Sequence, residues 1–449
     1  MTQSPARLTL ARTRSVCPVC LEQIEAERFL RGDTVYLGKT CPTHGRFEVP
    51  VWRGAAAYLA WGRQQAPRSA PTGRLTAVDK GCPHDCGLCP DHRQQSCCVL
   101  IEVTSRCDIA CPVCFASAGR QGTDADFATI EGWLDTLNTA GGRVHIQLSG
   151  GEPTVRDDLA DIIRLTRSKG FDFVQLNSNG IRLARDPAYV AALAAAGLDC
   201  VFLQFDGVTD AVYQRTRGAR LMALKEKAID ACAAVGIGVV LVPTLVPGVN
   251  TQEIGAIVDF AVARLPAVRA VHFQPVSYFG RCLKAPEDAD RVTLPEVMSA
   301  LARHCPGVSL ADFRPGSAEN AYCSFSGRFS VDRDNRFHAL GGPVSCCGVA
   351  PEPDAVRPSP AVDRERRSVA GQWKRPASPC GDGLDAFDAF LASRERTLGL
   401  SGMAFQDAWT LDIDRLRQCH IHIMAPDNRV IPFCAYNLTS MDGKALYRR

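Results

Sequence analysis

Three cysteines that follow a short apolar run constrain the fold of this chain more than any other feature. The run spans residues 98–104, and Cys107, Cys111 and Cys114 come after it with the spacing Cys-x-x-x-Cys-x-x-Cys. Cysteine thiolates are the usual protein ligands of iron–sulfur clusters. Three thiolates at this spacing can hold three irons of a 4Fe–4S cluster and leave the fourth iron open to a reactant. The pattern therefore predicts a chemically active cluster at the end of a strand.

The composition argues against several other classes of protein. The 449 residues carry 51 basic and 48 acidic side chains, a balance that does not favour a nucleic-acid partner. Hydrophobic residues make up 46% of the chain, enough for a sizeable core. No run is long and apolar enough to predict a transmembrane segment, and residues 1–7 lack the apolar centre of a secretion signal. We therefore expect a cytoplasmic protein, with peripheral attachment to a membrane left open.

The 21 cysteines need an explanation in a chain that is expected in a reducing compartment. Disulfides are rare there, and most of the cysteines stand in short-spaced groups that are typical of metal ligands. Cys200 and Cys232 lie instead in a strand-like and a helix-like run, where we interpret them as small buried apolar residues. The grouping predicts several metal centres rather than disulfide bonds.

Residues 1–75 are predicted to form a separate metal-binding module. The candidate ligands are Cys17, Cys20, Cys41 and His44. The first two stand in a Cys-Pro-x-Cys turn, and the others form a second turn after a stretch with the pattern of a hairpin. Two such turns supply four ligands for one tetrahedral zinc or iron ion, as in a rubredoxin-like or zinc-ribbon-like module. A metal-free hairpin is the alternative.

A second Cys-x-x-x-Cys-x-x-Cys group lies in residues 76–97, after a linker rich in Pro, Ser and Ala. It consists of Cys82, Cys86 and Cys89. No strand precedes it, and we interpret it as three ligands of an auxiliary 4Fe–4S cluster, with a second zinc site as the alternative. Cys97, Cys98 or a C-terminal cysteine are the candidates for its fourth ligand.

Strands and helices alternate between residues 98 and 280. The strand candidates are residues 98–104, 144–148, 173–176, 200–205, 238–242 and 270–273. The amphipathic stretches between them are residues 129–137, 159–168, 188–196, 221–235 and 252–264. This order predicts an α/β fold, a partial (β/α)6 barrel of parallel strands. Active sites of such barrels lie at the carboxyl ends of the strands, which is where the first cysteine group stands.

Small polar residues follow the second, third and fourth predicted strands at the same edge of the barrel. They are Gly150, Gly151, Glu152, Asn177, Gln204 and Asp206. Paired glycines allow a backbone to approach a ligand closely, and a carboxylate beside them can accept hydrogen bonds from an ammonium group. The alternative for the last three residues is turn capping. The arrangement predicts a binding site for a polar small molecule beside the cluster.

Residues 281–449 are predicted to form a small Cys-rich C-terminal domain. A stretch at about residues 348–382, rich in Pro, Arg, Ser and Ala, is interpreted as a mobile linker or surface loop. Further on, Cys419 and Cys434 flank a predicted hairpin, which would bring their thiols together. With Cys323 they are predicted to bind another auxiliary cluster or to complete the first. Cys346 and Cys347 are further candidates for this site.

The first cysteine group with Phe115 after it, followed by Gly150-Gly151-Glu152 at the next strand end, resembles the radical S-adenosylmethionine (radical SAM) superfamily. The resemblance implies that the cluster reductively cleaves SAM to a 5'-deoxyadenosyl radical, which functionalises an unactivated C–H bond. It also implies which groups bind SAM. Glu152 would contact the ammonium group, and the polar residues after the third and fourth strands would contact the ribose and carboxylate.

The order of the cysteine motifs along nearly the whole chain is similar to the group that contains tetraether lipid synthase (Tes), which joins lipid tails through C–C bonds. Residues 92–98 and 419–422 look most like the (seleno)protein branch called TrsS, here with ordinary cysteines. This resemblance implies auxiliary 4Fe–4S clusters that serve C–C or C–S bond formation on a small-molecule or lipid substrate. It implies an electron donor such as a ferredoxin or flavodoxin.

The resemblance leaves the substrate open. Residues 320–322 lack the histidines expected before Cys323 in a lipid-coupling relative, and residues 351–379 look like an insertion. Proteins of the Tes group have also been described as pterin methyltransferases, so a radical methyltransferase of a pterin-like molecule is the alternative reaction. An iron–sulfur electron carrier and a zinc-ribbon nucleic-acid module are the alternatives from other classes. An electron carrier needs neither an open iron nor a nucleoside pocket, and the balanced charge disfavours nucleic acid.

Overall fold

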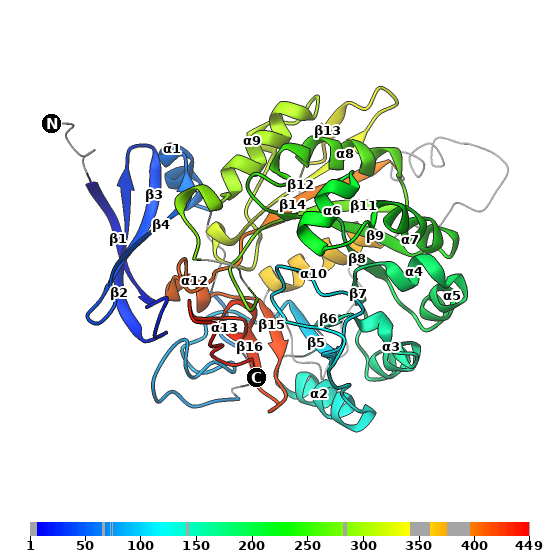
Figure 1. The fold of residues 1–449 in the computed structure, drawn as a ribbon, viewed down its shortest axis with the longest axis horizontal. Helices are drawn as coiled ribbons and strands as arrows, with labels where there is room; N and C mark the ends of the chain where they lie inside the picture. The colour runs from blue at the N-terminus through cyan, green and yellow to red at the C-terminus, as the bar shows by residue number, and fades with distance from the viewer. Residues whose placement is uncertain are drawn as a thin grey trace.

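The N-terminal module is an antiparallel sheet in the computed structural model, which describes residues 7–64, 68–71, 73, 75–140, 142, 144–281, 285–341, 360–374 and 396–448. The four strands β1 (Arg7–Val16), β2 (Gln23–Arg31), β3 (Thr34–Cys41) and β4 (Gly45–Arg53) pair in chain order, and α1 (Ala55–Trp61) follows. The sheet lies beside the barrel (Figure 1). Lys39 fixes it there, because its buried ammonium group donates a 2.7 Å hydrogen bond to the Ala408 carbonyl.

Six parallel strands form the predicted barrel. They are β5 (Cys98–Thr104), β6 (His145–Gly150), β7 (Val174–Ser178), β8 (Cys200–Gln204), β9 (Gly238–Val242) and β11 (Val268–Pro275). Neighbours in the chain are neighbours in the sheet, and each pair is parallel. The prediction of a partial (β/α)6 barrel is confirmed, and the strand ends agree within a few residues.

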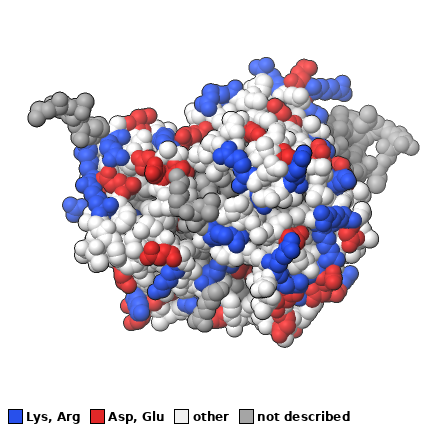
Figure 2. Space-filling model, in the orientation of Figure 1, with Lys and Arg blue, Asp and Glu red and all other residues white. Residues whose placement is uncertain are grey.

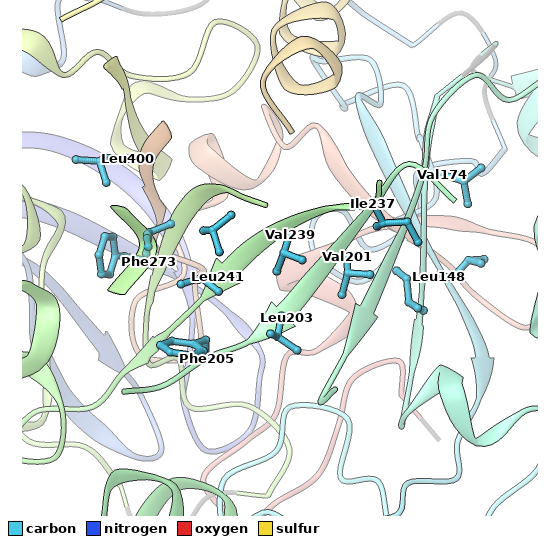
Figure 3. Close-up of a cluster of buried hydrophobic side chains, with 14 of the residues drawn as sticks. Leu148, Val174, Val201, Leu203, Phe205, Ile237, Val239, Leu241, Phe273 and Leu400 are labelled. Carbon is cyan, nitrogen blue, oxygen red and sulfur yellow. The ribbon is translucent and has the colours of Figure 1, made fainter. Parts of the chain in front are cut away.

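Helices cover the outer face of this sheet. They are α2 (Phe127–Ala140), α3 (Leu159–Ser168), α4 (Ile181–Arg185), α5 (Pro187–Ala195), α6 (Asp210–Arg217), α7 (Met222–Ala234) and α8 (Ile254–Ala263). Apolar strand residues such as Leu148, Val201 and Leu241 cluster on this face (Figure 3). They form one continuous core with most of these helices. Cys200 and Cys232 are fully buried, as their apolar surroundings in the sequence predicted.

The inner face of the barrel sheet carries polar residues, because successive side chains of a strand point to opposite faces. On β6, Ile146 and Leu148 belong to the outer core. His145, Gln147 and Ser149 alternate with them and line a cavity inside the barrel. Polar side chains of β6 therefore face the cavity, whereas β8 and β9 present apolar residues to it, such as Phe202 and Val242.

C-terminal strands extend the barrel sheet at both edges. At one edge β14 (Thr397–Met403) is parallel to β11, and β12 (Ser324–Val331) and β13 (Phe337–Ala339) follow antiparallel. At the other edge β15 (Ile421–Met424) is parallel to β5 and forms a hairpin with β16 (Val430–Pro432). The hairpin predicted between Cys419 and Cys434 is confirmed. The C-terminal region therefore lengthens the barrel wall, which its sequence did not indicate.

A helix stands inside the predicted linker. Residues 348–382 were expected to be a mobile linker, but α10 (Pro360–Trp373) is helical, and the prediction is wrong for these residues. Val362 is fully buried against Cys97 and Ala318, and the Trp373 ring packs 4.7 Å from that of Phe202. The composition was misleading because some polar residues of this helix, such as Glu365 and Gln372, line the cavity. The remaining residues of the predicted linker lie outside the described ones.

The other helices are α9 (Leu294–His304), α12 (Ile413–Leu416) and α13 (Phe433–Tyr436). None of the helices in the described part of the chain has the length and apolar character needed to cross a bilayer. Basic and acidic side chains are interspersed on the face shown in Figure 2. This mixture agrees with the balanced charge of the sequence.

Candidate functional site

A cavity of about 640 Å³ occupies the barrel interior. One end lies at the carboxyl ends of the strands and is lined by the first cysteine group and the Gly-Gly-Glu turn. The other end lies where the strands begin and is lined by α10, residues 314–319 and His420. Amide and imidazole side chains form a band between the two ends. They are His145, Gln147, Gln175, Asn177, Gln204, His272 and Gln274.

The loop after β5 presents Cys107, Cys111 and Cys114 to the cavity. Backbone hydrogen bonds fix its shape: the Cys107 amide donates to the Gly119 carbonyl at 2.7 Å, and Cys114 exchanges two bonds with Arg281. The Arg281 side chain also donates to the Cys111 carbonyl at 2.9 Å. The loop is therefore held by bonds that do not involve its three thiols.

The chemistry of this donor set fits an iron–sulfur cluster. Burial raises the pKa of Cys107 to about 12, and the nearby charges of Glu152, Asp108 and Cys111 add to the effect. Three thiolates in such surroundings are unfavourable without a cation, because desolvation and mutual repulsion both oppose their charge. Metal binding removes this cost, since the ligands are deprotonated and neutralised together. Cys107, Cys111 and Cys114 are thus suited to hold a cluster.

Two glycines allow the end of β6 to lie against the start of the cysteine loop. A Cβ at Gly150, whose φ is 134°, would lie 2.0 Å from the Thr104 carbonyl oxygen, and one at Gly151 would lie 2.1 Å from that of Arg106. The amides of Gly151 and Glu152 each donate a 2.8 Å hydrogen bond to these carbonyls. The glycines are therefore required by the approach of two backbone segments, in addition to any approach of a ligand.

Glu152 joins the ends of β6 and β7. Its Oε1 accepts hydrogen bonds from the Thr154 amide and hydroxyl and from the Ser178 hydroxyl, and its Oε2 accepts one from the Asn179 amide at 2.6 Å. Burial raises the pKa of this carboxyl group. The side chain lines the cavity, and Oε2 retains the capacity to accept one more donor. The predicted contact to the SAM ammonium group stays a prediction.

Changing Glu152 to Gln should weaken SAM binding and destabilise the fold by about 1–3 kcal/mol, because an amide nitrogen would face buried donors. Iron content should stay unchanged, since Glu152 is not placed as a metal ligand. Equilibrium dialysis with SAM, thermal unfolding and iron analysis measure the three effects. Asp157→Asn is the matched control, because that carboxylate is 92% exposed. A loss of iron in the Glu152 variant equal to its loss of SAM binding would contradict this role.

Asn177 and Gln204 both line the cavity, as a ligand-binding role requires. Asn177 accepts a hydrogen bond from the Gln147 amide and donates one to the Ser149 hydroxyl at 3.3 Å. Gln204 Oε1 is buried and has no hydrogen-bond partner in the described part of the chain. An unpaired buried carbonyl is costly unless a ligand donates to it. Gln204 is therefore the better placed of the two to bind a ligand.

Asp206 lies behind the cavity wall rather than in it. It is fully buried and forms an ion pair with Arg217, whose Nε is 2.6 Å from its Oδ2. The Thr216 hydroxyl and the Thr244 amide also donate to it. Against the effect of burial, Arg217 and these donors lower the pKa of Asp206. The contact of Asp206 with SAM that we predicted is not part of this geometry, and Asp206 instead positions Arg217.

Arg217 is a site residue that the sequence did not reveal. It lines the cavity, and its Nη1 lies 3.9 Å from the Cys111 sulfur. No motif or spacing marks it, because its role depends on the ion pair with Asp206 across the turn from β8 to α6. It brings one positive charge to the cysteine loop, where it can counter thiolate or carboxylate charge.

The N-terminal module brings its four candidate ligands together. One ligand atom from each of Cys17, Cys20, Cys41 and His44 lies within 4.8 Å of the other three. His44 Nδ1 is 3.5 Å from the Cys17 sulfur and 3.4 Å from that of Cys41. Three thiols and one imidazole at this spacing fit a single tetrahedral ion.

Replacing Cys17 and Cys20 together by Ser should remove one metal ion per chain and leave the iron of the barrel unchanged. Half of the tetrahedral donor set is lost, whereas the cysteine loop after β5 is separate from this module. Elemental analysis of the purified protein measures both metals. Cys232→Ser is the control, because this thiol is buried in α7 away from the cysteine groups. Loss of barrel iron in the double variant would show that the two sites depend on each other.

The second cysteine group is also gathered in space. A hydrogen bond with Cys82, burial and the charges of Cys82 and Cys89 raise the pKa of the Cys86 thiol. The Cys86 amide donates to the Tyr447 hydroxyl at 2.9 Å. Cys97 and Cys98, which we considered as fourth ligands, line the barrel cavity instead. The wall of that cavity includes none of the three grouped cysteines.

Cys323, Cys419 and Cys434 form a third group at the C-terminal hairpin. Burial, together with the charges of Cys434 and Cys323, raises the pKa of the Cys419 thiol. Arg415 donates to the Cys323 sulfur at 3.5 Å, and the Gln406 amide donates to that of Cys434 at 3.2 Å. The antiparallel pairing of β15 with β16 draws together the segments that carry Cys419 and Cys434, and a shared site with Cys323 stays a prediction. Cys346 and Cys347 lie outside the described residues.

Comparisons with known proteins agree with this site. Residues 101–261 match the radical SAM superfamily and residues 9–53 match the HMPTM N-terminal zinc ribbon domain. The chain is 33% identical to 7,8-dihydro-6-hydroxymethylpterin dimethyltransferase of Methanocaldococcus jannaschii, over 95% of this chain and 93% of that protein. It is 35% identical to PqqA peptide cyclase of Streptomyces rochei over 36% of this chain and 44% of that protein. The solved structure of Streptococcus suis SuiB bound to S-adenosylmethionine has a TM-score of 0.37 and 17% identity, covering 47% of each chain.

The cysteine loop inside a parallel barrel and the superfamily match together define the class: the chain belongs to the radical SAM superfamily and is an enzyme that uses a 4Fe–4S cluster and SAM. The match over nearly the full length places it in the family of the Methanocaldococcus pterin dimethyltransferase. Its N-terminal module is a zinc ribbon. Placement in the TrsS branch stays a prediction.

Proposed function

We propose that this enzyme methylates a pterin-like small molecule inside the barrel by a radical reaction. A hydrogen atom passes from a saturated carbon of the pterin to the 5'-deoxyadenosyl radical, and a one-carbon co-substrate, with electrons from the reductant, supplies the methyl group that takes its place. The observation that supports this most is the polar band of the cavity, where amides and imidazoles such as Gln147, Gln175 and His272 face inward. A flat nitrogen heterocycle can satisfy such groups with hydrogen bonds at its edges. A lipid chain offers no donor to Gln204 Oε1, which is buried and has no hydrogen-bond partner among the described residues, and leaving this carbonyl unpaired costs free energy. The full-length relative named a pterin dimethyltransferase supports the same substrate class.

The 4Fe–4S cluster that Cys107, Cys111 and Cys114 would hold supplies the electron that cleaves SAM to a 5'-deoxyadenosyl radical. The residues of the chain orient the reactants around it. Gln204 and Glu152 would accept hydrogen bonds from SAM, which their position in the cavity lining and the unpaired Gln204 carbonyl support. Arg217, held by Asp206, brings a positive charge beside Cys111.

Exclusion of water from the cavity would protect a reactive radical. The helix α10 covers the end of the barrel where the strands begin, and Trp373 packs there against Phe202 and His272, with ring centroids 4.7 Å and 6.3 Å away. Phe433 lines the wall beside the cysteine loop and packs on Phe115 at 5.7 Å. These apolar contacts limit side reactions with solvent.

Auxiliary clusters complete the proposal. Cys82, Cys86 and Cys89 would hold one, and Cys323, Cys419 and Cys434 would hold another. A small ferredoxin or flavodoxin is the expected electron donor. The variant that lacks the three cysteines of the loop after β5 should retain cubane clusters by iron and sulfide analysis and by EPR. Replacing Cys419 and Cys434 as well should lower the iron and sulfide content by about one cubane cluster per chain. An unchanged content would reject the C-terminal site alone, and a first variant without any cluster would reject both sites.

The substrate is tested with 7,8-dihydro-6-hydroxymethylpterin deuterated on its saturated carbons, incubated anaerobically with enzyme, SAM and a reductant. Transfer of deuterium into 5'-deoxyadenosine, or a methylated pterin in the product mixture, supports the proposal. A lipid substrate with deuterated tails is the matched comparison. Deuterium transfer from the lipid and none from the pterin would overturn the proposal in favour of lipid chemistry.

A further inference from the structure

The end of the cavity away from the cysteine loop holds polar groups that the reaction described above does not use. His420 comes directly before β15, and the pairing of Ile421 with Cys98 and of Cys98 with His145 places it where the barrel strands begin. The cysteine loop follows the opposite end of β5, a strand of seven residues. At roughly 3.3 Å per residue the two ends are about 20 Å apart. A substrate bound at the His420 end therefore leaves the other end free for SAM.

Glu319 and His420 face each other across this end and line the cavity. They are 3% and 5% exposed, and Glu319 Oε2 lies 3.3 Å from His420 Nδ1. This distance is that of an ion pair when the imidazole is protonated, but the contact does not have the geometry of a hydrogen bond. Within the described residues neither atom has any hydrogen-bond partner. A buried acceptor and a neighbouring buried ring nitrogen are thus both left to bind a ligand, because such groups are rarely unpaired in native proteins.

The surroundings of Glu319 hold its carboxylate in this orientation. Its Oε1 accepts a hydrogen bond from the Ser324 hydroxyl, which in turn accepts one from the Gly316 amide at 3.1 Å. A Cβ on Gly316 would lie 2.0 Å from Glu319 Oε1, so only glycine leaves room for the carboxylate. Glu365 on α10, the neighbouring acid, is already engaged, because one of its oxygens accepts from both the amide and the hydroxyl of Ser317. Of these two acids, Glu319 is therefore the one with an oriented carboxylate and an oxygen without a hydrogen-bond partner in the described part of the chain.

We propose that Glu319 and His420 bind the aminopyrimidine edge of the pterin-like substrate, an inference that rests on the proposed function. That edge presents two adjacent N–H donors, the ring N3–H and the exocyclic 2-amino group, which match the two oxygens of a carboxylate. The acceptors beside them, N1 or the 4-oxo group, match an N–H of His420. A substrate held by this edge points its saturated ring toward the middle of the barrel and the SAM end.

Binding specificity tests this assignment on the intact holoenzyme. Equilibrium dialysis under anaerobic conditions compares 7,8-dihydro-6-hydroxymethylpterin with the matching dihydrolumazine, in which a carbonyl replaces the 2-amino group. The native enzyme should prefer the pterin by about a hundredfold or more, because a carboxylate that faces a carbonyl is left unpaired. Glu319→Gln should lose most of this preference, since an amide can donate to the lumazine carbonyl.

Two further variants keep the test decisive. Glu365→Gln is the matched control and should change pterin affinity by less than about threefold. The Glu365 carboxylate is already hydrogen-bonded to Ser317 and is not expected to contact the pterin. Ser324→Ala keeps the carboxylate but removes the hydroxyl that orients it, and should weaken pterin binding by about threefold to tenfold. Iron content and circular dichroism confirm that each variant is folded.

The outcomes separate this inference from the proposed function. If the native enzyme binds the pterin and Glu319→Gln retains both affinity and preference, the Glu319 assignment is wrong while the pterin substrate stands. If Glu365→Gln shows the loss instead, the edge lies against α10 and the assignment fails. If the native enzyme binds neither compound, the pterin substrate and this inference both fail.

Discussion

Replacing Cys107, Cys111 or Cys114 by Ala should abolish formation of 5'-deoxyadenosine from SAM. Each thiol lines the cavity on a loop whose backbone is held by other bonds, so each variant should fold and lose only one iron ligand. With only two cysteine ligands, a 4Fe–4S cluster would have two irons without a protein ligand. It would either be lost or no longer present the single open iron that binds SAM. Chromatography of the reaction with SAM and dithionite measures the nucleoside.

Two measurements show whether such a loss is specific. The zinc ribbon should keep its metal in all three variants, because Cys17, Cys20, Cys41 and His44 form a separate site. Cys200→Ala is the control, because this thiol is fully buried yet stands apart from the cysteine groups, and it should leave SAM cleavage intact. Reductive cleavage of SAM by the variant that lacks all three loop cysteines would refute the assignment of the site.

The barrel could be predicted from the sequence because its signals are local. Each strand of the barrel is a short apolar run followed by an amphipathic helix, and a strand such as β9, which is buried on both faces, shows this run clearly. The strands β12, β14 and β15 join the same sheet, but they pair with partners distant in the chain and have no helix after them. The sequence therefore indicated a separate C-terminal domain where the structure extends the barrel wall. The helix α10 was also missed, because its polar residues gave the stretch the composition of a linker.

The residues of the candidate site also differ in whether local sequence signals or contacts between distant segments define them. The cysteine groups could be predicted because the ligands of each lie within one loop or two turns of fixed spacing. Asp206 was predicted to face the cavity, but it lies behind Arg217, and this ion pair could not be inferred from the sequence. Glu319 and His420 carry no motif and are about a hundred residues apart, so their contact exists only in the folded chain.

Changing Asp206 to Ala should destabilise the enzyme by about 3–5 kcal/mol, because it leaves the buried Arg217 guanidinium without its partner. Urea denaturation of the holoenzyme measures this loss. Asp161→Ala is the matched control, because both side chains of its ion pair with Arg164 are more than half exposed, so its loss should cost under about 1 kcal/mol. Equal effects of the two variants would contradict the buried pair.

The dependence on pH gives the same pair an independent test. The pKa of Asp206 lies below its usual 3.8 in the folded enzyme, because Arg217 and the donors around it outweigh burial. A carboxyl group with a lowered folded-state pKa contributes stability that is fully present above its unfolded pKa and is lost as pH falls through the folded value. The stability difference between native enzyme and the Asp206→Ala variant should thus be constant near neutral pH and shrink below about pH 4. A difference that stays constant down to pH 2 would show that packing, rather than the charge of Asp206, holds Arg217 beside the cysteine loop.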